Sequence, residues 1–189
     1  MPILGITASQ ITGRLSAPDT GAMFPLGMVQ VGSGGTSSVS FSSIPSTYKH
    51  LQIRGISQCT NVKEFHIQIN SDTGSNYSYH NLYGNGSSAG AAGASTQDKI
   101  ATLTQVGSAT ATSTFSALVI DILDYSLTSK YKTLRILSGT NQNNTTDEMG
   151  LTSGLWQSTS AINTIKLFPT STGTFTQYTQ FALYGIKGA

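Results

Sequence analysis

The chain of 189 residues is long enough for one domain, or one domain with an arm, and can bury a substantial core without disulfides. Only 10% of its residues are charged, whereas an ordinary soluble domain has about 25%, so Ser, Thr, Asn, Gln and Gly must supply the polarity of a surface suited to dense assembly. The net charge of +2 comes from scattered basic residues. This argues against nucleic-acid binding, which needs a concentrated basic stripe.

The sequence contains a single cysteine, Cys59, so no internal disulfide can form. We expect assembly in a reducing cytoplasm, with an intermolecular disulfide as the lesser alternative. Residues 1 to 15 lack a basic n-region and a long apolar run, and no stretch approaches the roughly 20 apolar residues of a membrane span. Neither secretion by a signal peptide nor membrane insertion is expected.

Residues 1–23 differ from the rest and predict an N-terminal arm, because isolated apolar residues alternate with Gly, Ser and Thr before the break at Ala17–Gly21. We expect a neighbouring protein to hold this arm through its apolar side chains, which are Ile3, Leu4, Ile6, Ile11 and Leu15.

From Phe24 to the end, short runs with period-two alternation are separated by turn signals, which predicts one β-sandwich domain over residues 24–189. The runs around Val29–Val31 and Val39–Phe41 flank a glycine loop and predict a hairpin. Strands are also predicted around Leu51–Ile53 and Phe65–Ile69, each with one polar face.

In the second half, an aromatic stretch at Tyr77–Tyr83 precedes a segment of Gly, Ala, Ser and Asn over Gly84–Ser95, for which we predict an exposed loop. The nearly continuous apolar run Phe115–Leu123 predicts a central strand covered on both faces. Further strands are predicted over Ile100–Val106, Tyr131–Leu137, Leu151–Gln157, Ile162–Phe168 and Gln177–Ile186.

This pattern of nine or ten short strands predicts an all-β fold, a jelly-roll-like β-sandwich with an extended N-terminal arm. The strand order stays open.

Candidate catalytic motifs are weak. Gly86–Gly90 matches G-x-S-x-G, but it lacks the strand before and the helix after that give this motif its meaning, so a flexible loop is the preferred interpretation. Asp121 and Asp124 should point to opposite faces of a strand and cannot act as a pair. We expect Asp121 to accept hydrogen bonds or to pair with Arg135 or Lys132.

No cofactor, metal or catalytic site is expected. Asn70, Asp72 and Gly74 faintly match a calcium loop without its bidentate glutamate and are better explained by a β-turn. His50 and His66 could meet across neighbouring strands, which leaves a minor possibility of a metal site on a symmetry axis.

Tyr77, Tyr79 and Tyr83 are candidates for glycan or interface contacts, because exposed aromatic rings stack on sugars and anchor interfaces. Alternation in a sandwich would equally bury some of them, and core or interface packing is the preferred interpretation.

Four segments resemble a group of small phage and metagenomic virion proteins: Ile44–Arg54, Gly74–His80, Ile120–Tyr125 with Lys130–Thr133, and Phe181–Lys187. The likeness covers roughly residues 29 to 187. Members of this group are described as structural, decoration or fibre-like proteins, and the arm also looks like the usual beginning of such proteins.

The resemblance implies a virion protein of a tailed bacteriophage. We therefore expect a capsid decoration (cement) protein that binds the major capsid protein or another virion protein, favoured as a trimer, with its arm on a neighbouring subunit. The alternative is a tail fibre or adhesin module that binds host surface glycan through Tyr77–Tyr83. A glycan-cleaving enzyme is the least favoured class, because no carboxylate pair can be inferred.

Overall fold

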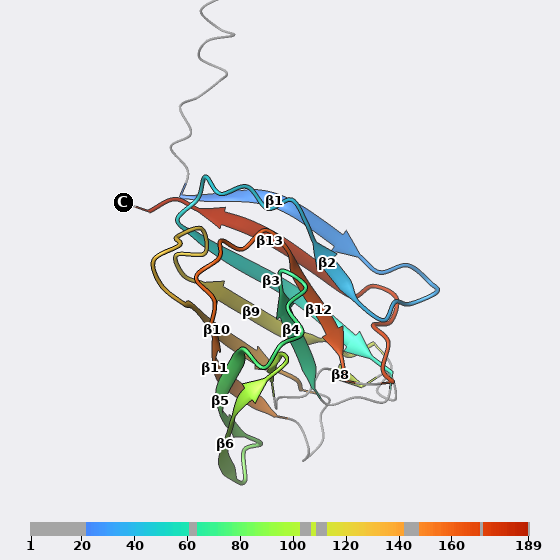
Figure 1. Ribbon diagram of the computed structural model, residues 1–189. Coiled ribbons are helices and arrows are strands. Elements are labelled where there is room, and N and C mark those ends of the chain that lie inside the picture. The colour runs from blue at the N-terminus through green and yellow to red at the C-terminus, as the bar shows by residue number, and fades with distance from the viewer. Residues whose placement is uncertain are drawn as a thin grey trace, which may run out of the picture.

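The computed structural model describes residues 22–60, 64–102, 107–108, 113–141, 148–170 and 172–188, which form two β-sheets packed against each other (Figure 1). The predicted all-β sandwich is confirmed, while the jelly-roll-like topology stays a prediction. In the described part of the chain, no helix is long and apolar enough to cross a membrane.

The large sheet has the strand order β1-β13-β3-β9-β10-β11-β5-β6, and β8 pairs with the end of β3. All pairings along this path are antiparallel, whereas β8 runs parallel to β3. The strands are β1 (Met23–Gln30), β3 (His50–Cys59), β5 (Tyr77–Gly84), β6 (Ala89–Gln97), β8 (Gly107–Ser108), β9 (Ser116–Ile122), β10 (Lys132–Gly139), β11 (Met149–Trp156) and β13 (Gln180–Ile186).

The small sheet has the order β2-β12-β4-β7 and is also antiparallel. Its strands are β2 (Val39–Phe41), β4 (Phe65–Ile69), β7 (Ile100–Ala101) and β12 (Ile165–Pro169).

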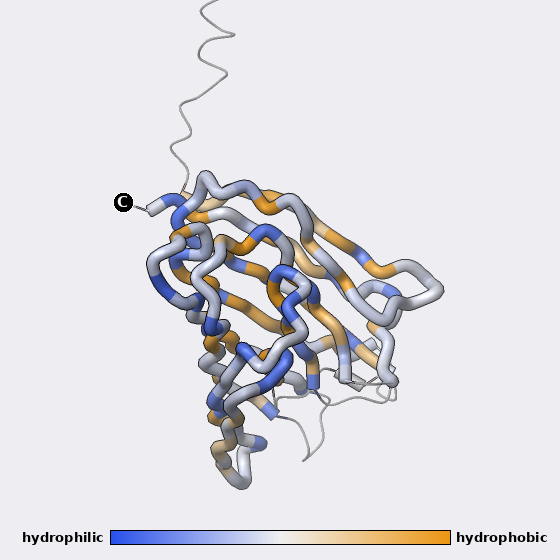
Figure 2. The backbone as a smooth tube through the Cα atoms, in the orientation of Figure 1, coloured by the Kyte–Doolittle hydropathy of each residue, from blue (hydrophilic) through white to orange (hydrophobic). Residues whose placement is uncertain are grey.

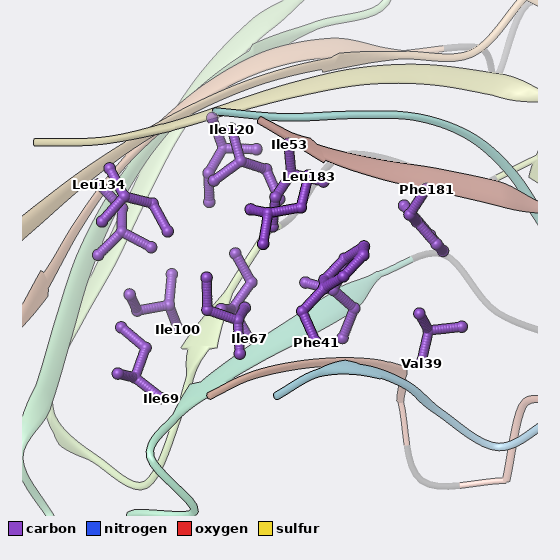
Figure 3. Close-up of a cluster of buried hydrophobic side chains, with 14 of the residues drawn as sticks. Val39, Phe41, Ile53, Ile67, Ile69, Ile100, Ile120, Leu134, Phe181 and Leu183 are labelled. Atoms are coloured by element: carbon purple, nitrogen blue, oxygen red, sulfur yellow. The ribbon is translucent and has the colours of Figure 1, made fainter. Parts of the chain in front are cut away.

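One hydrophobic core lies between the two sheets (Figure 3). Alternation places one set of apolar side chains from each strand inside, as in β9, where Leu118, Ile120 and Ile122 are buried. Ile67 and Ile69 of the small sheet meet Ile53 of the large sheet from the opposite side. Each such fully buried side chain contributes roughly 1.5–3 kcal/mol.

The run predicted as the central strand is indeed central, since β9 lies between β3 and β10. However, the described part of the chain covers only one of its faces. Ala117 is exposed, and Val119 and Asp121 are partly exposed on the other face. The prediction of a strand covered on both faces is therefore wrong for this chain by itself.

The predicted hairpin between the first two strands is also wrong, because β1 lies at one edge of the large sheet and β2 at one edge of the small sheet. The connecting segment crosses between the sheets. Gly35 has a φ of 66° there, and a Cβ at this position would lie 2.8 Å from the carbonyl oxygen of Phe175. Only glycine fits this crossing without strain.

Much of the segment predicted as an exposed loop is strand β6, which pairs with β5. Its residues do not drive strand formation by burial. Instead, the Tyr83 ring lies where a Cβ of Gly90 would be, and the His80 ring lies over Gly93. Aromatic rings thus cover the glycines of this edge strand and support the pairing.

The first and last strands lie side by side, with Met23 opposite Ile186 and the Lys187 amide donating to the Ala22 carbonyl at 3.1 Å. β1 is the first described strand of the sandwich, and the boundary predicted after residue 23 stays a prediction. The predicted arm and its apolar residues Ile3, Leu4, Ile6, Ile11 and Leu15 lie outside the described residues.

Candidate functional site

The outer face of the large sheet, which points away from the core, carries a set of exposed or partly exposed apolar side chains. We call this set the apolar band. Leu82, Leu137 and Met149 are 61%, 51% and 63% exposed. The band consists of Ile56, Leu82, Ala91, Ala117, Val119, Leu137, Met149 and Leu151, from strands β3, β5, β6, β9, β10 and β11.

Strand register brings these residues together. Leu151 of β11 lies directly opposite Leu82 of β5 and Leu137 of β10. Leu137 in turn lies opposite Val119, and Ile56 lies opposite Ala117. Side chains directly opposite each other on one face are close enough to touch. The band is therefore a continuous surface that runs across neighbouring strands, although its members are far apart in sequence.

A polar row lies beside the band on the same face. Asp121 is directly opposite Arg135 on one side and Gln52 on the other. The Gln52 amide donates to Asp121 Oδ1 at 2.7 Å, and Arg54 Nε donates to Gln52 Oε1 at 2.7 Å. The expectation that Asp121 accepts hydrogen bonds is confirmed. Asp121 thus belongs to a linked polar border of the band.

Open hollows follow the band. One is lined by Leu82, Ala91 and Leu151 together with His80. A second lies between Val119, Leu137 and Met149, and a third adjoins Ile56 and Val119. These hollows are broad and predominantly apolar, and the residues that line them include no converging acid and base groups, which suits protein side chains better than a reactive substrate.

Lys132, named above as a possible partner of Asp121, lies on the opposite face of β10, so that pairing is wrong. Its side chain is buried in the sandwich. Its Nζ atom donates to the carbonyl oxygens of Leu127, Lys130 and Thr159 at 2.6, 2.9 and 3.1 Å. Burial, followed by the neighbouring Lys130 charge, lowers the pKa of Lys132.

Asp124 lies just after β9 and forms a surface ion cluster. Lys49 Nζ lies 3.0 Å from its carboxylate, which Lys130 also contacts. Hydrogen bonds from Lys130 and Lys49 lower the pKa of Asp124 to about 2. The His50 ring accepts a hydrogen bond from the Asp124 amide at 3.0 Å. This cluster fixes the turn after β9 and presents no unused acid or base.

The G-x-S-x-G segment forms the turn of the β5–β6 hairpin. The Asn85 side-chain oxygen accepts hydrogen bonds from the amides of Ser87 and Ser88 at 3.1 and 2.8 Å, and the Ser88 hydroxyl bonds to the same oxygen. The motif therefore lies between two strands, and its serine helps to close a turn.

The two histidines considered for a metal site do not meet. His50 is in the large sheet, whereas His66 is in the small sheet and packs edge-on against Phe168 with ring centroids 5.3 Å apart. Burial, followed by the Lys99 charge, lowers the pKa of His66 to about 4. Among the described residues, no three His, Cys, Asp or Glu side chains are grouped to hold a metal ion.

Asp72 serves a turn. Its carboxylate accepts hydrogen bonds from the Gly74 amide at 2.8 Å and from Trp156 Nε1 at 2.7 Å, and Asn76 donates to both of its oxygens. The turn interpretation of Asn70–Gly74 accounts for these contacts.

Cys59 is fully buried, and burial raises the pKa of its thiol to about 12. A disulfide to another chain would require the fold to open.

The three tyrosines are in different surroundings. Tyr77 is fully buried and stacks on Trp156, and its hydroxyl bonds to the backbone of Ile69 at 3.0 and 3.2 Å. Tyr77 therefore cannot contact a glycan or a partner. Tyr79 is partly buried against the core, and Tyr83 is partly buried across Gly90.

Comparison of the sequence with models of protein families gives no match, and neither does comparison with curated proteins. The candidate site therefore depends on the geometry described above. Sequence reasoning missed the band as a surface because its residues were assigned to separate strands. The available signal was the apolar character of both faces in Phe115–Leu123, which indicates a covering layer on the outer face that the described residues do not supply.

Proposed function

We propose that this chain is a structural protein of a bacteriophage virion, a decoration or cement protein that binds the major capsid protein or another virion protein on the capsid exterior. The observation that supports this proposal most is the apolar band. Soluble monomers rarely leave a large contiguous apolar surface exposed, and such surfaces commonly mark protein interfaces. The resemblance to phage virion proteins is the reason for proposing that the chain acts on a virion.

The charged groups support action by binding rather than by catalysis. Asp124 is neutralised by Lys49 and Lys130, Asp72 closes a turn, and Lys132 holds three carbonyl oxygens. Each of these groups has a structural role in the sandwich. The chain then works as a rigid module whose outer surface contacts its neighbours.

The arm adds a second contact in this proposal. The first described residue, Ala22, accepts a hydrogen bond from the Lys187 amide just after β13. Twenty-one extended residues can span up to about 70 Å, which is enough to reach an adjacent subunit. Its apolar side chains would each contribute roughly 1.5–3 kcal/mol when fully buried there.

The test uses particles assembled without this protein and purified full-length variants added back. The double substitution Leu137→Lys and Leu151→Lys places two charges in the band, so we expect binding to particles, measured by co-sedimentation, to weaken roughly tenfold or more. Deletion of residues 1–15 should also abolish incorporation while leaving the domain folded.

The matched control is Ser40→Lys, an exposed position on the small sheet, which should bind as the parent does. Circular dichroism should show the same fold in all variants. Undiminished decoration by the double variant would rule out docking through the band.

The glycan-binding alternative has weaker support. Of its three tyrosines, Tyr77 is buried, and Tyr79 packs against the core. A glycan array separates the two functions, because specific binding lost on Tyr83→Ala would favour an adhesin.

A further inference from the structure

Strand β6 forms one edge of the large sheet, and no described strand pairs with its outer side. The hairpin of β5 and β6 projects from the lower end of the body (Figure 1). The nine residues Ala89–Gln97 contain neither proline nor charge. Natural edge strands are usually protected against further pairing by proline, charge, bulges or short length. Apart from a bulge near its C-terminal end, β6 lacks these protections.

The opposite edge strand of the large sheet, β1, is protected against pairing with a further strand. Pro25 has no N–H to donate, and the register shifts between Pro25 and Gly27. Proline and a bulge both disfavour pairing with another strand. The two edges of the large sheet therefore differ, and only β6 offers a regular open ladder.

The strand register determines which backbone N–H and C=O groups of β6 face the open edge. The Asn85 amide donates to the Ser88 carbonyl, so this pair at the hairpin turn is hydrogen-bonded. Hydrogen-bonded and non-hydrogen-bonded pairs alternate along an antiparallel ladder. The register places Ala89, Ala91 and Gly93 at non-hydrogen-bonded positions. Their N–H and C=O groups therefore point to the open edge.

The open ladder ends within β6. Thr96 has a φ of 55°, and the register with β5 is irregular between Tyr77 and Tyr79. The Ser95 carbonyl accepts hydrogen bonds from the side chains of Thr96 and Gln97 at 2.6 and 2.8 Å. The free segment is thus short, and Ala91 is at its centre.

We propose that β6 pairs antiparallel with β6 of a second copy of this chain, around a two-fold axis close to Ala91. The sequence favoured a trimer as the homo-oligomer, whereas this edge strand supports a two-fold dimer, a contact that goes beyond the proposed docking to the virion. The outward groups of Ala89, Ala91 and Gly93 in both copies form about six backbone hydrogen bonds in this arrangement. The segment is uncharged, so the two copies meet without like-charge repulsion.

The apolar band reaches this edge, because Ala91 lies opposite Leu82. A two-fold axis perpendicular to the sheet keeps the outer faces of both copies on the same side. The bands of the two copies then join through Ala91 into one longer surface. A ring of three copies joined through the edges of this sheet would instead pair β6 with β1 of the next copy, which Pro25 and the bulge disfavour.

The test measures the mass of the purified full-length chain in solution by light scattering after size-exclusion chromatography. We expect a dimer. Ala91→Lys places like charges at the two-fold axis, and Ala91→Pro removes an outward N–H without breaking the β5–β6 ladder, so both should halve the mass. Met28→Lys, on the same face of the opposite edge strand, is the matched control and should stay dimeric.

Cysteine cross-linking checks the register, since the natural cysteine is buried. Ala91→Cys should form a disulfide-linked dimer under mild oxidation, because opposite residues of a hydrogen-bonded pair have Cα atoms about 5.5 Å apart. Ala89→Cys should not, because its copies would be more than about 10 Å apart.

A monomeric or trimeric parent chain would overturn the proposal, as would a dimer disrupted by Met28→Lys but not by Ala91→Lys. Cross-linking at position 89 rather than 91 would overturn the axis at Ala91. All of these measurements are made without particles, so a failure here leaves docking to the virion separately testable.

Discussion

At the scale of single residues, the most unusual side chain is Lys132, a buried cation that donates to backbone carbonyl oxygens. Its ammonium group donates to the carbonyl oxygens of Leu127, Lys130 and Thr159. These hydrogen bonds connect the loop after β9 to the segment before β12. Such a group stabilises the fold because its own buried ammonium group is satisfied by acceptors from two separate segments of the chain.

Lys132→Met should therefore lower the free energy of unfolding by about 2 kcal/mol or more, because three carbonyl oxygens lose their donor. Urea denaturation followed by tryptophan fluorescence measures this change. Lys99→Met is the control: Lys99 forms an exposed ion pair with Asp98, and its loss should cost less than about 1 kcal/mol. Equal effects of the two substitutions would contradict this role for Lys132.

Asp124 gives stability a defined pH dependence. Its folded pKa of about 2 lies below the ordinary value of 3.8, so the unfolded chain binds the proton more readily. Its contribution is complete above about pH 4 and is lost as the pH falls towards 2. Asp124→Asn should remove this part of the pH dependence, as measured by denaturation between pH 2 and 5.

Asn is a suitable replacement because the residue has a φ of 49°, which Asn tolerates well. The difference in stability between the parent and the variant should shrink as the pH approaches 2. A constant difference across this range would show that the carboxylate charge is not responsible.

Burial of individual polar residues could not be predicted from the sequence. Lys132 looks like a surface residue in a linear pattern, and for Tyr77 the pattern favoured packing without deciding between the core and an interface. Lys132 is tolerated inside because its position meets three free carbonyls, and Tyr77 because its hydroxyl reaches the backbone of Ile69. Such partners come from distant segments and are known only after folding.

At the scale of elements, the crossing from β1 to β2 depends on Gly35. Gly35→Ala should destabilise the fold by about 1–3 kcal/mol, because the added Cβ meets the Phe175 carbonyl and the φ is positive. Thermal unfolding measures the effect. A Cβ added at the adjacent Gly34 would have nothing within 4 Å of it, so Gly34→Ala should be close to neutral. A similar loss in both variants would contradict this explanation.

Alternation predicted the strands of the second half well, since buried residues alternate strictly with exposed or partly buried ones in β10, β11 and β13. It failed for β6, whose Ala and Gly residues have little strand propensity and depend on pairing with β5. It also could not decide whether β1 and β2 pair, because alternation gives the face of a strand but not its neighbour.

At the scale of the whole molecule, composition and pattern were sufficient to predict two packed sheets, but not the order of their strands. Hydrophobic residues recur along the strands throughout (Figure 2). Which of them meet on the outer face depends on the register between strands as distant in sequence as β5 and β11. The apolar band was therefore visible only in the folded structure.

The pairing of β1 with β13 has a mechanical consequence. The two strands run antiparallel, and Ala22 and Lys187 lie at the same end of their ladder. Tension between the two ends of the chain would open this ladder one hydrogen bond at a time, as a zipper opens. Tension between Met23, at the start of β1, and Gln180, at the opposite end of the ladder, would load many of these hydrogen bonds together. The sandwich should therefore resist force applied between Met23 and Gln180 better than force applied between Ala22 and Lys187.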